Sequence, residues 1–132
     1  MQRILHTMLR IGNLQRSIDF YTQVIGMQVL RTFEQPEERY SLVFLGFKKE
    51  SEACVLELTY NYGISEYELG HAYGHIAIGV TDIQQTVKDI KKQNVQISLE
   101  PTQLKGGNEI IAFLTDPDGY QIELIERPVS WF

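Results

Sequence analysis

The chain has 132 residues, of which 43% are hydrophobic, so it can bury the core of one domain or of two small modules that share a core. Its formal net charge of −5 argues against a nucleic-acid-binding protein, whose surface would be basic. The single cysteine, Cys54, excludes an internal disulfide, and no apolar run approaches the ~20 residues of a membrane-spanning helix. We therefore expect a soluble, cytoplasmic protein.

The first half of the chain predicts a strand, a helix and three further strands. Strand-like sequence at 4–11 precedes a helix whose N-cap is Asn13 and whose end is marked by Gly26. Apolar residues recur at helical spacing between these two residues. The three strands follow, with polar breaks between them, at 28–33, 40–47 and 53–60.

The second half predicts the same order of elements. A strand at 74–80 leads into a helix at 82–94, where Asp82 and Gln85 resemble a capping box. The sequence "DPDG" at 116–119 is typical of a tight turn between strands. The strands after this helix are predicted at 95–99, 109–114 and 120–126.

The two halves are copies of one module. At one constant spacing His6 aligns with His75 and Phe44 with Phe113, and at a spacing three residues shorter Glu57 aligns with Glu123. A second hairpin connection that is three residues shorter would explain the change. We predict an α+β fold in which a single domain, 1–132, contains two repeats, 1–65 and 70–132.

Side-chain alternation along the strands places a histidine and a glutamate of each module away from the apolar face that the helix covers. His6 shares its face with Arg10, opposite Leu9, and Glu57 lies opposite the neighbouring leucines. Cys54 falls on the leucine face and is predicted to be a buried, inert thiol. One such histidine or glutamate is more often a surface residue or half of an ion pair than a ligand.

Four such residues at corresponding repeat positions favour a metal site instead. Imidazole and carboxylate groups suit Zn, Ni, Co, Mn or Fe, and a six-coordinate ion would keep two positions for water or substrate oxygens. The predicted ligands are His6, Glu57, His75 and Glu123.

Long ordered segments of the chain, such as "LHTMLRIGNLQRSIDFYTQVIGM" and "AFLTDPDGYQIELIE", resemble bacterial glyoxalase I (lactoylglutathione lyase) of the vicinal-oxygen-chelate superfamily. The resemblance implies tandem βαβββ modules that form curved mixed sheets. It also implies isomerisation of the methylglyoxal–glutathione hemithioacetal to S-D-lactoylglutathione, by proton transfer through a metal-bound enediolate. The four ligands of the family fall on the four residues named above, with Glu123 as the favoured base and Glu57 opposite it.

The resemblance further implies the cofactor and the substrate contacts. A histidine at the first ligand position, in a short chain, is similar to the type activated by Ni²⁺ or Co²⁺, although the ligand chemistry also accepts Zn²⁺. Arg10 and Asn61 match residues at the glutamyl end of glutathione, and Lys105 matches a loop lysine near the glycyl carboxylate. His71 stands where some relatives have an arginine for the substrate. A plain salt bridge for Arg10 and a solvated charge for Lys105 stay open as alternatives.

Short bacterial members of the family pair their modules across a homodimer, so the resemblance implies active sites at a subunit interface. Two other functions compete with the lyase. An acyl-CoA epimerase would use similar ligands with another substrate pocket, whereas Arg10, Asn61 and Lys105 favour glutathione. A non-catalytic binding protein commonly lacks the metal ligands, and all four are present here.

Overall fold

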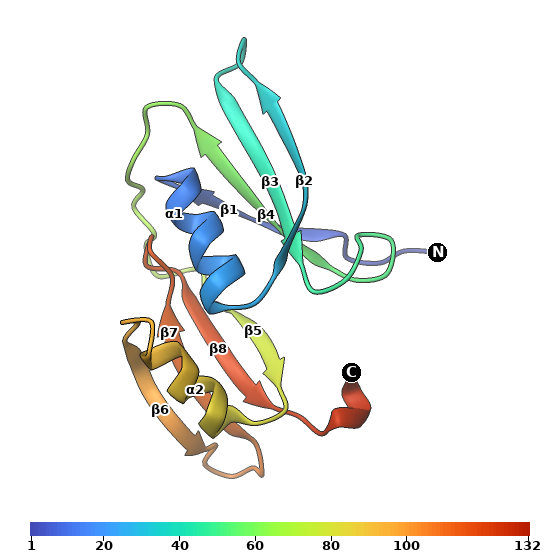
Figure 1. Ribbon diagram of the computed structural model, residues 1–132, viewed down its shortest axis with the longest axis vertical. Helices are drawn as coiled ribbons and strands as arrows, with labels where there is room; N and C mark the ends of the chain where they lie inside the picture. The colour runs from blue at the N-terminus through green and yellow to red at the C-terminus, as the bar shows by residue number, and fades with distance from the viewer. The chain divides into compact units, whose positions relative to one another are not determined.

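Each half of the chain folds into a four-stranded mixed sheet with a helical segment beside it. The computed structural model describes all 132 residues and divides them into two compact units, Met1–Glu68 and Leu69–Phe132 (Figure 1). This arrangement confirms the predicted α+β fold with tandem βαβββ modules. The prediction that both repeats form a single domain stays a prediction.

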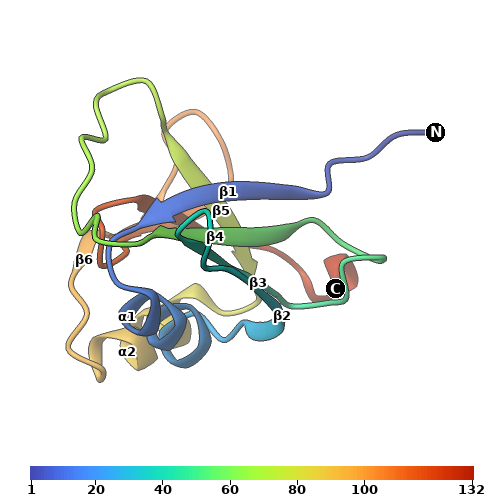
Figure 2. The same cartoon turned by 90° about the horizontal axis from the view of Figure 1, so that it is seen from above.

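The sheet of the first unit has the strand order β1-β4-β3-β2. Strand β1 runs parallel to β4, as the two lie side by side in Figure 2, and the other neighbours are antiparallel. Alternate residues such as Leu9, Ile11 and Leu58 are almost fully buried and form the core face. The strands are β1 (His6–Ile11), β2 (Gln28–Gln35), β3 (Tyr40–Gly46) and β4 (Val55–Asn61).

The helical segment of the first unit begins as predicted but does not stay α-helical. The side chain of Asn13 accepts a hydrogen bond from the Arg16 amide at 3.0 Å, and α1 (Leu14–Asp19) follows. A π-helical turn, Phe20–Val24, then continues to Gly26, whose φ of 92° ends the helix as expected. Phe20 and Tyr21 of this turn are both buried, and their rings meet edge to face with centroids 5.0 Å apart.

The second unit repeats the topology with the order β5-β8-β7-β6. Its helix, α2 (Ile83–Lys91), buries Ile83, Val87 and Ile90 against the sheet. Asp82 caps the helix through the Gln85 amide at 3.0 Å, but the Gln85 side chain bonds Asp89, so the predicted capping box is only half formed. The strands are β5 (His75–Val80), β6 (Ile97–Gln103), β7 (Ile110–Thr115) and β8 (Gln121–Glu126), and a 3-10 turn follows at Val129–Trp131.

The repeat extends to irregularities of the edge strands. A β-bulge in β2 places Arg31, rather than Leu30, opposite Phe44, and a bulge in β6 places Leu99 opposite Phe113 in the same way. The β3–β4 connection spans 47–54, whereas the β7–β8 connection spans 116–120. The second is three residues shorter, which accounts for the change of spacing between the two glutamates.

The turn before the last strand is confirmed, whereas the prediction for Cys54 is wrong. Gly119 has a φ of 94°, and the Asp116 side chain accepts the amides of Asp118 and Tyr120, each at 2.9 Å. Cys54 is exposed because β4 begins at Val55, so strand alternation does not govern the cysteine.

Candidate metal and substrate site

The first histidine–glutamate pair lies on the face of the first sheet opposite its buried core. Glu57 stands beside Met8 in the β1–β4 register, and His6 is two residues before Met8 on the same face. The Nε2 atom of His6 is 2.8 Å from Oε2 of Glu57. Glu57 is only 9% exposed, whereas the His6 side chain is 38% exposed, so the carboxylate is the more deeply buried member of the pair.

The second pair repeats this placement in the second unit. Glu123 stands beside Ala77 in the β5–β8 register, and His75 is two residues before Ala77. The Nε2 atom of His75 is 3.5 Å from Oε1 of Glu123, and the histidine side chain is 41% exposed. The second pair is therefore the more widely separated of the two, while the exposure of its side chains is close to that of the first pair.

Each histidine is held from the side by a phenylalanine. The rings of His6 and Phe44 meet edge to face with centroids 5.7 Å apart, and those of His75 and Phe113 meet in the same way at 5.2 Å. The packing limits rotation of both imidazoles while leaving their Nε2 atoms directed at the glutamates.

In the first unit a cation also packs on the phenylalanine. The guanidinium carbon of Arg31 lies 3.7 Å from the centre of the Phe44 ring, and Glu50 accepts hydrogen bonds from Arg31 at 2.7 and 3.1 Å. This bond to Arg31 lowers the pKa of the Glu50 carboxyl, and the bond to Glu50 raises the pKa of Arg31. The second unit has Leu99 at the position of Arg31.

In each pair the histidine nitrogen and the glutamate oxygen are spaced as two neighbouring ligands of one metal ion would be. Nitrogen and oxygen ligands bind a divalent transition metal at about 2.1 Å, so two atoms bound at right angles lie about 3 Å apart. The observed separations of 2.8 and 3.5 Å are close to this value. Neither unit adds a third His, Cys, Asp or Glu beside its pair. Each unit thus offers half of the predicted ligand set.

The residues predicted to bind the glutamyl end lie at one end of the first sheet. Arg10 stands beside Thr59 in the β1–β4 register, and Asn61 is the last residue of β4. The Nδ2 atom of Asn61 donates a hydrogen bond to the Tyr67 hydroxyl at 2.9 Å. No sequence motif identifies Tyr67 as a partner of Asn61.

The other two predicted contacts lie in loops of the second unit. Lys105 is in the β6–β7 connection, which lines an open hollow of about 560 Å³ formed by residues 102–108. His71 is exposed and precedes β5. The structure shows no hydrogen bond or ion pair from either side chain to His75 or Glu123.

A second cavity, of about 270 Å³, lies on the same face as the second pair. Ala77 and Gly79 continue the row that begins with His75, and Ile125 and Arg127 continue the row of Glu123. No motif of the sequence points to the C-terminal segment that borders this cavity. Its wall is completed by Trp131 and Phe132.

Comparison with known proteins shows what this arrangement belongs to. Residues 3–124 match the model of the Glyoxalase/Bleomycin resistance protein/Dioxygenase superfamily. The chain belongs to that superfamily. Within the superfamily it is 56% identical over 125 residues to lactoylglutathione lyase of Escherichia coli O157:H7, covering 95% of this chain and 93% of the relative.

Solved structures of the superfamily agree. The trypanothione-dependent glyoxalase I of Leishmania major is 52% identical with a TM-score of 0.87, over 96% of this chain and 87% of that one. Glyoxalase I of Zea mays is 44% identical with a TM-score of 0.92, over 96% of this chain. The chain spans about half the length of the maize protein, covering 45% of it.

These similarities confirm the resemblance to glyoxalase I and identify the chain as an enzyme of the lactoylglutathione lyase group. None of the helices combines the length and the apolar character of a membrane-spanning segment.

Proposed function

We propose that the chain is a metal-dependent lactoylglutathione lyase, which isomerises the hemithioacetal of methylglyoxal and glutathione to S-D-lactoylglutathione and so detoxifies methylglyoxal in the cytoplasm. The observation that carries the proposal is the matched histidine–glutamate pair in each unit. Full-length similarity to lactoylglutathione lyases supports it.

The proposed metal site takes two ligands from each module. His6 and Glu57 of one subunit and His75 and Glu123 of the partner subunit would hold one divalent ion, with two such sites in a homodimer. A pair in each unit without a third neighbouring ligand supports the need for both halves. Ni²⁺ or Co²⁺ is the favoured ion, and Zn²⁺ also fits the nitrogen and oxygen donors.

The reaction moves a proton between two neighbouring carbons. The divalent ion, when bound, stabilises as a Lewis acid the negative charge that develops on the substrate oxygens. Glu123 removes the proton and returns it to the adjacent carbon, which contributes about 10²–10⁴-fold to the rate. The wider separation in the pair of Glu123 supports this choice, since that carboxylate is less tightly held than Glu57. Glu57 lies on the other side of the reacting carbon.

The substrate is held by its charged ends. Arg10 and Asn61 bind the glutamyl end, and Lys105 binds the glycyl carboxylate from its loop. His71 replaces an arginine of some relatives at a further contact. The open hollow around Lys105 is accessible to a carboxylate, which supports its part in the proposal.

Metal-by-metal activation of the stripped protein tests the proposal. Thioester absorbance is followed after methylglyoxal and glutathione are mixed with the protein and with Ni²⁺, Co²⁺ or Zn²⁺ in turn. A parallel series with trypanothione identifies the thiol. We expect thioester formation with glutathione that requires a divalent ion and is fastest with Ni²⁺ or Co²⁺. A folded protein that forms no thioester with any ion would exclude the lyase.

A further inference from the structure

The segment that follows β4 returns to the end of its own sheet and presents the hydroxyl of Tyr67 to Asn61. The Asn61 amide nitrogen donates to this hydroxyl at 2.9 Å, and both residues are half-buried. We propose that Tyr67 is a positioning residue, which fixes the Asn61 amide so that its oxygen accepts a hydrogen bond from the ammonium of a γ-glutamyl group. This inference rests on the proposed function, in which Asn61 binds the glutamyl end.

The backbone before Tyr67 is fixed in position by a hydrogen bond and by a close contact with the end of β1, as a positioning residue requires. The amide of Ile64 donates to the Asn61 carbonyl at 3.1 Å, which turns the chain directly after β4. The segment then passes over Gly12, where an added Cβ would lie 2.0 Å from the Ser65 carbonyl oxygen. Only a glycine permits this approach. The segment is thus pressed against the end of β1, which also carries Arg10.

The orientation of an amide decides what it can bind. A carboxamide has a donor end and an acceptor end, and either end can face a ligand. The bond to Tyr67 uses the nitrogen as donor, which leaves the Oδ1 atom as the acceptor for an ammonium. Without the hydroxyl the amide would be free to turn its nitrogen towards the ligand, where it would face the ammonium with the wrong polarity.

The first experiment compares Tyr67→Phe with Tyr62→Phe. Tyr62 lies on the same segment, and its hydroxyl bonds Ser41 at 3.0 Å instead of Asn61, so it is a matched control. Both variants keep the aromatic ring, and their melting temperatures verify the fold. Calorimetry measures binding of S-methylglutathione and of its des-amino analogue, S-methyl glutarylcysteinylglycine, which keeps the terminal carboxylate and lacks the ammonium.

We expect Tyr67→Phe to weaken binding of S-methylglutathione about three- to tenfold, and to leave binding of the des-amino analogue unchanged. Tyr62→Phe should change neither. In turnover, Tyr67→Phe should raise KM for the glutathione adduct by the same factor with kcat unchanged. Equal losses for both ligands would assign Tyr67 a merely structural role and overturn the inference, as would no loss for either ligand.

A second variant pair tests whether Tyr67 acts through Asn61. Asn61→Ala should weaken S-methylglutathione binding, and adding Tyr67→Phe to it should cause no further loss, because the amide that the hydroxyl orients is gone. Additive losses would contradict the inference. Failure of the proposed function would look different. A protein that binds S-methylglutathione but forms no thioester with any metal would contradict the lyase activity and leave the role of Tyr67 in binding intact.

Discussion

The two units share a ligand face and differ in what surrounds it. Each has a histidine on its first strand, a glutamate on its last, and a phenylalanine that contacts the histidine ring edge to face. In the first unit Arg31 covers the phenylalanine and is fixed by Glu50, whereas in the second unit Leu99 stands there. The first histidine–glutamate pair is thus supported by a charged side chain next to its phenylalanine, and the second pair only by an apolar one.

A second difference lies four residues beyond each glutamate. The first unit has Asn61, bonded to Tyr67 of the following segment. The second unit has Arg127, which bonds Glu109 at 2.6 Å and packs on Trp131 of its own following segment at 4.8 Å. Each segment places an aromatic residue against the end of its own sheet. In the first unit Tyr67 bonds the Asn61 amide, and in the second unit Trp131 packs on the Arg127 guanidinium.

The two units thus keep the proposed metal ligands, while the residues around these ligands differ. The strand register and the two bulges are common to both units, because they fix where the histidine, glutamate and phenylalanine lie. The positions around them can change without moving the ligands. We therefore expect the two units to contribute unequally to catalysis although their ligands are chemically equal.

The largest expected effect separates the two glutamates. Glu123→Gln keeps an oxygen for the proposed metal site but removes the proposed base, so kcat should fall about 10²–10⁴-fold. Glu57→Gln should cost less in kcat, because Glu57 is the tightly held partner rather than the proposed base. Thioester absorbance gives kcat, and calorimetric titration of the stripped protein gives the metal affinity of each variant.

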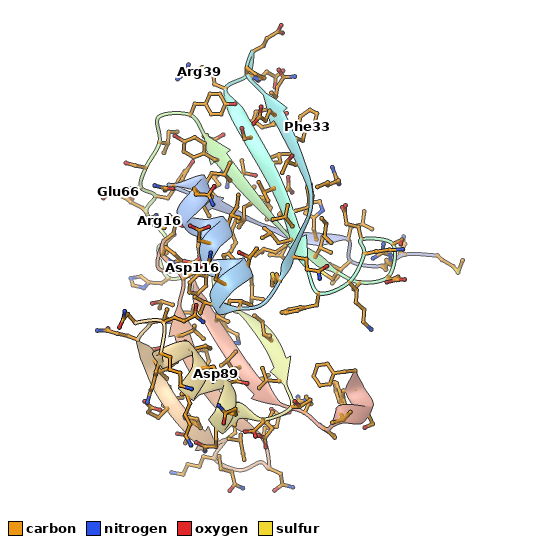
Figure 3. The ribbon with its side chains drawn as sticks, in the orientation of Figure 1. Arg16, Phe33, Arg39, Glu66, Asp89 and Asp116 are labelled. Carbon is orange, nitrogen blue, oxygen red and sulfur yellow. The ribbon has the colours of Figure 1, made fainter.

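The exposed Glu66, which points away from the first unit in Figure 3, is the matched control as Glu66→Gln and should behave like the unaltered protein. Equal losses of kcat in Glu57→Gln and Glu123→Gln, with equal metal affinities, would show that the two units share the chemistry evenly.

The next effect concerns the close approach of the Ser65 carbonyl to Gly12 in the first unit. Gly12→Ala places a Cβ 2.0 Å from the Ser65 carbonyl, so the segment before Tyr67 must shift, and unfolding should cost about 1–3 kcal/mol less. The second unit has Thr81 after its first strand, where Gly12 follows β1, and needs no glycine there. Chemical denaturation measures the free energy of unfolding.

Gly74→Ala is the control, because nothing lies within 4 Å of a Cβ added at Gly74. It should change the free energy of unfolding by far less. A Gly12→Ala protein as stable as the Gly74→Ala protein would mean that the segment is loosely held, and would weaken the positioning role of Tyr67.

The sequence predicts the repeat, the strands and the ligand faces because each depends on short-range periodicity. Alternation along a strand suffices to turn His6 and Glu57 to one face, since both lie within regular strands. It fails at Cys54, which precedes β4, and at Arg31, whose face is set by a bulge one residue earlier. Where the strand is irregular, alternation no longer predicts the side of a residue.

Contacts that depend on the path of a turn or loop could not be predicted. The bond between Asn61 and Tyr67 depends on how the intervening turn is folded, and the approach of Ser65 to Gly12 depends on the register of two strands. The π-helical turn at Phe20–Val24 is another example, because apolar spacing fits an α-helix equally well. A glycine after a strand was the one available signal for the close approach.

A smaller effect should follow when Arg31, which packs on Phe44 in the first unit, is replaced by leucine, the residue at this position in the second unit. Arg31→Leu removes the cation above Phe44, so His6 gains rotational freedom and metal affinity should fall about two- to fivefold. The d–d absorption of bound Co²⁺ should broaden as the ligand becomes less fixed. Arg39, at the β2–β3 turn in Figure 3, lies 5.9 Å from the Tyr62 ring, and Arg39→Leu should leave both readouts unchanged. An unchanged affinity in Arg31→Leu would mean that Phe44 alone holds the imidazole.

The smallest effect is a pH dependence that only the first unit should show. Arg31 lowers the pKa of Glu50 below its ordinary value of 4.5, so the pair stabilises the fold at pH values above that, and the stabilisation is lost as pH falls through the lowered pKa. The melting temperature of Glu50→Gln should therefore lie slightly below that of the unaltered protein at pH 7, and the gap should close as the pH falls through the lowered pKa of the Glu50 carboxyl. Because the Arg31 and Glu50 side chains are 53% and 34% exposed, the gap should also shrink in high salt. A difference in melting temperature that persists in acid would mean that Glu50 supports the unit by packing. The ion pair of Arg31 and Glu50 would then not distinguish the first unit from the second.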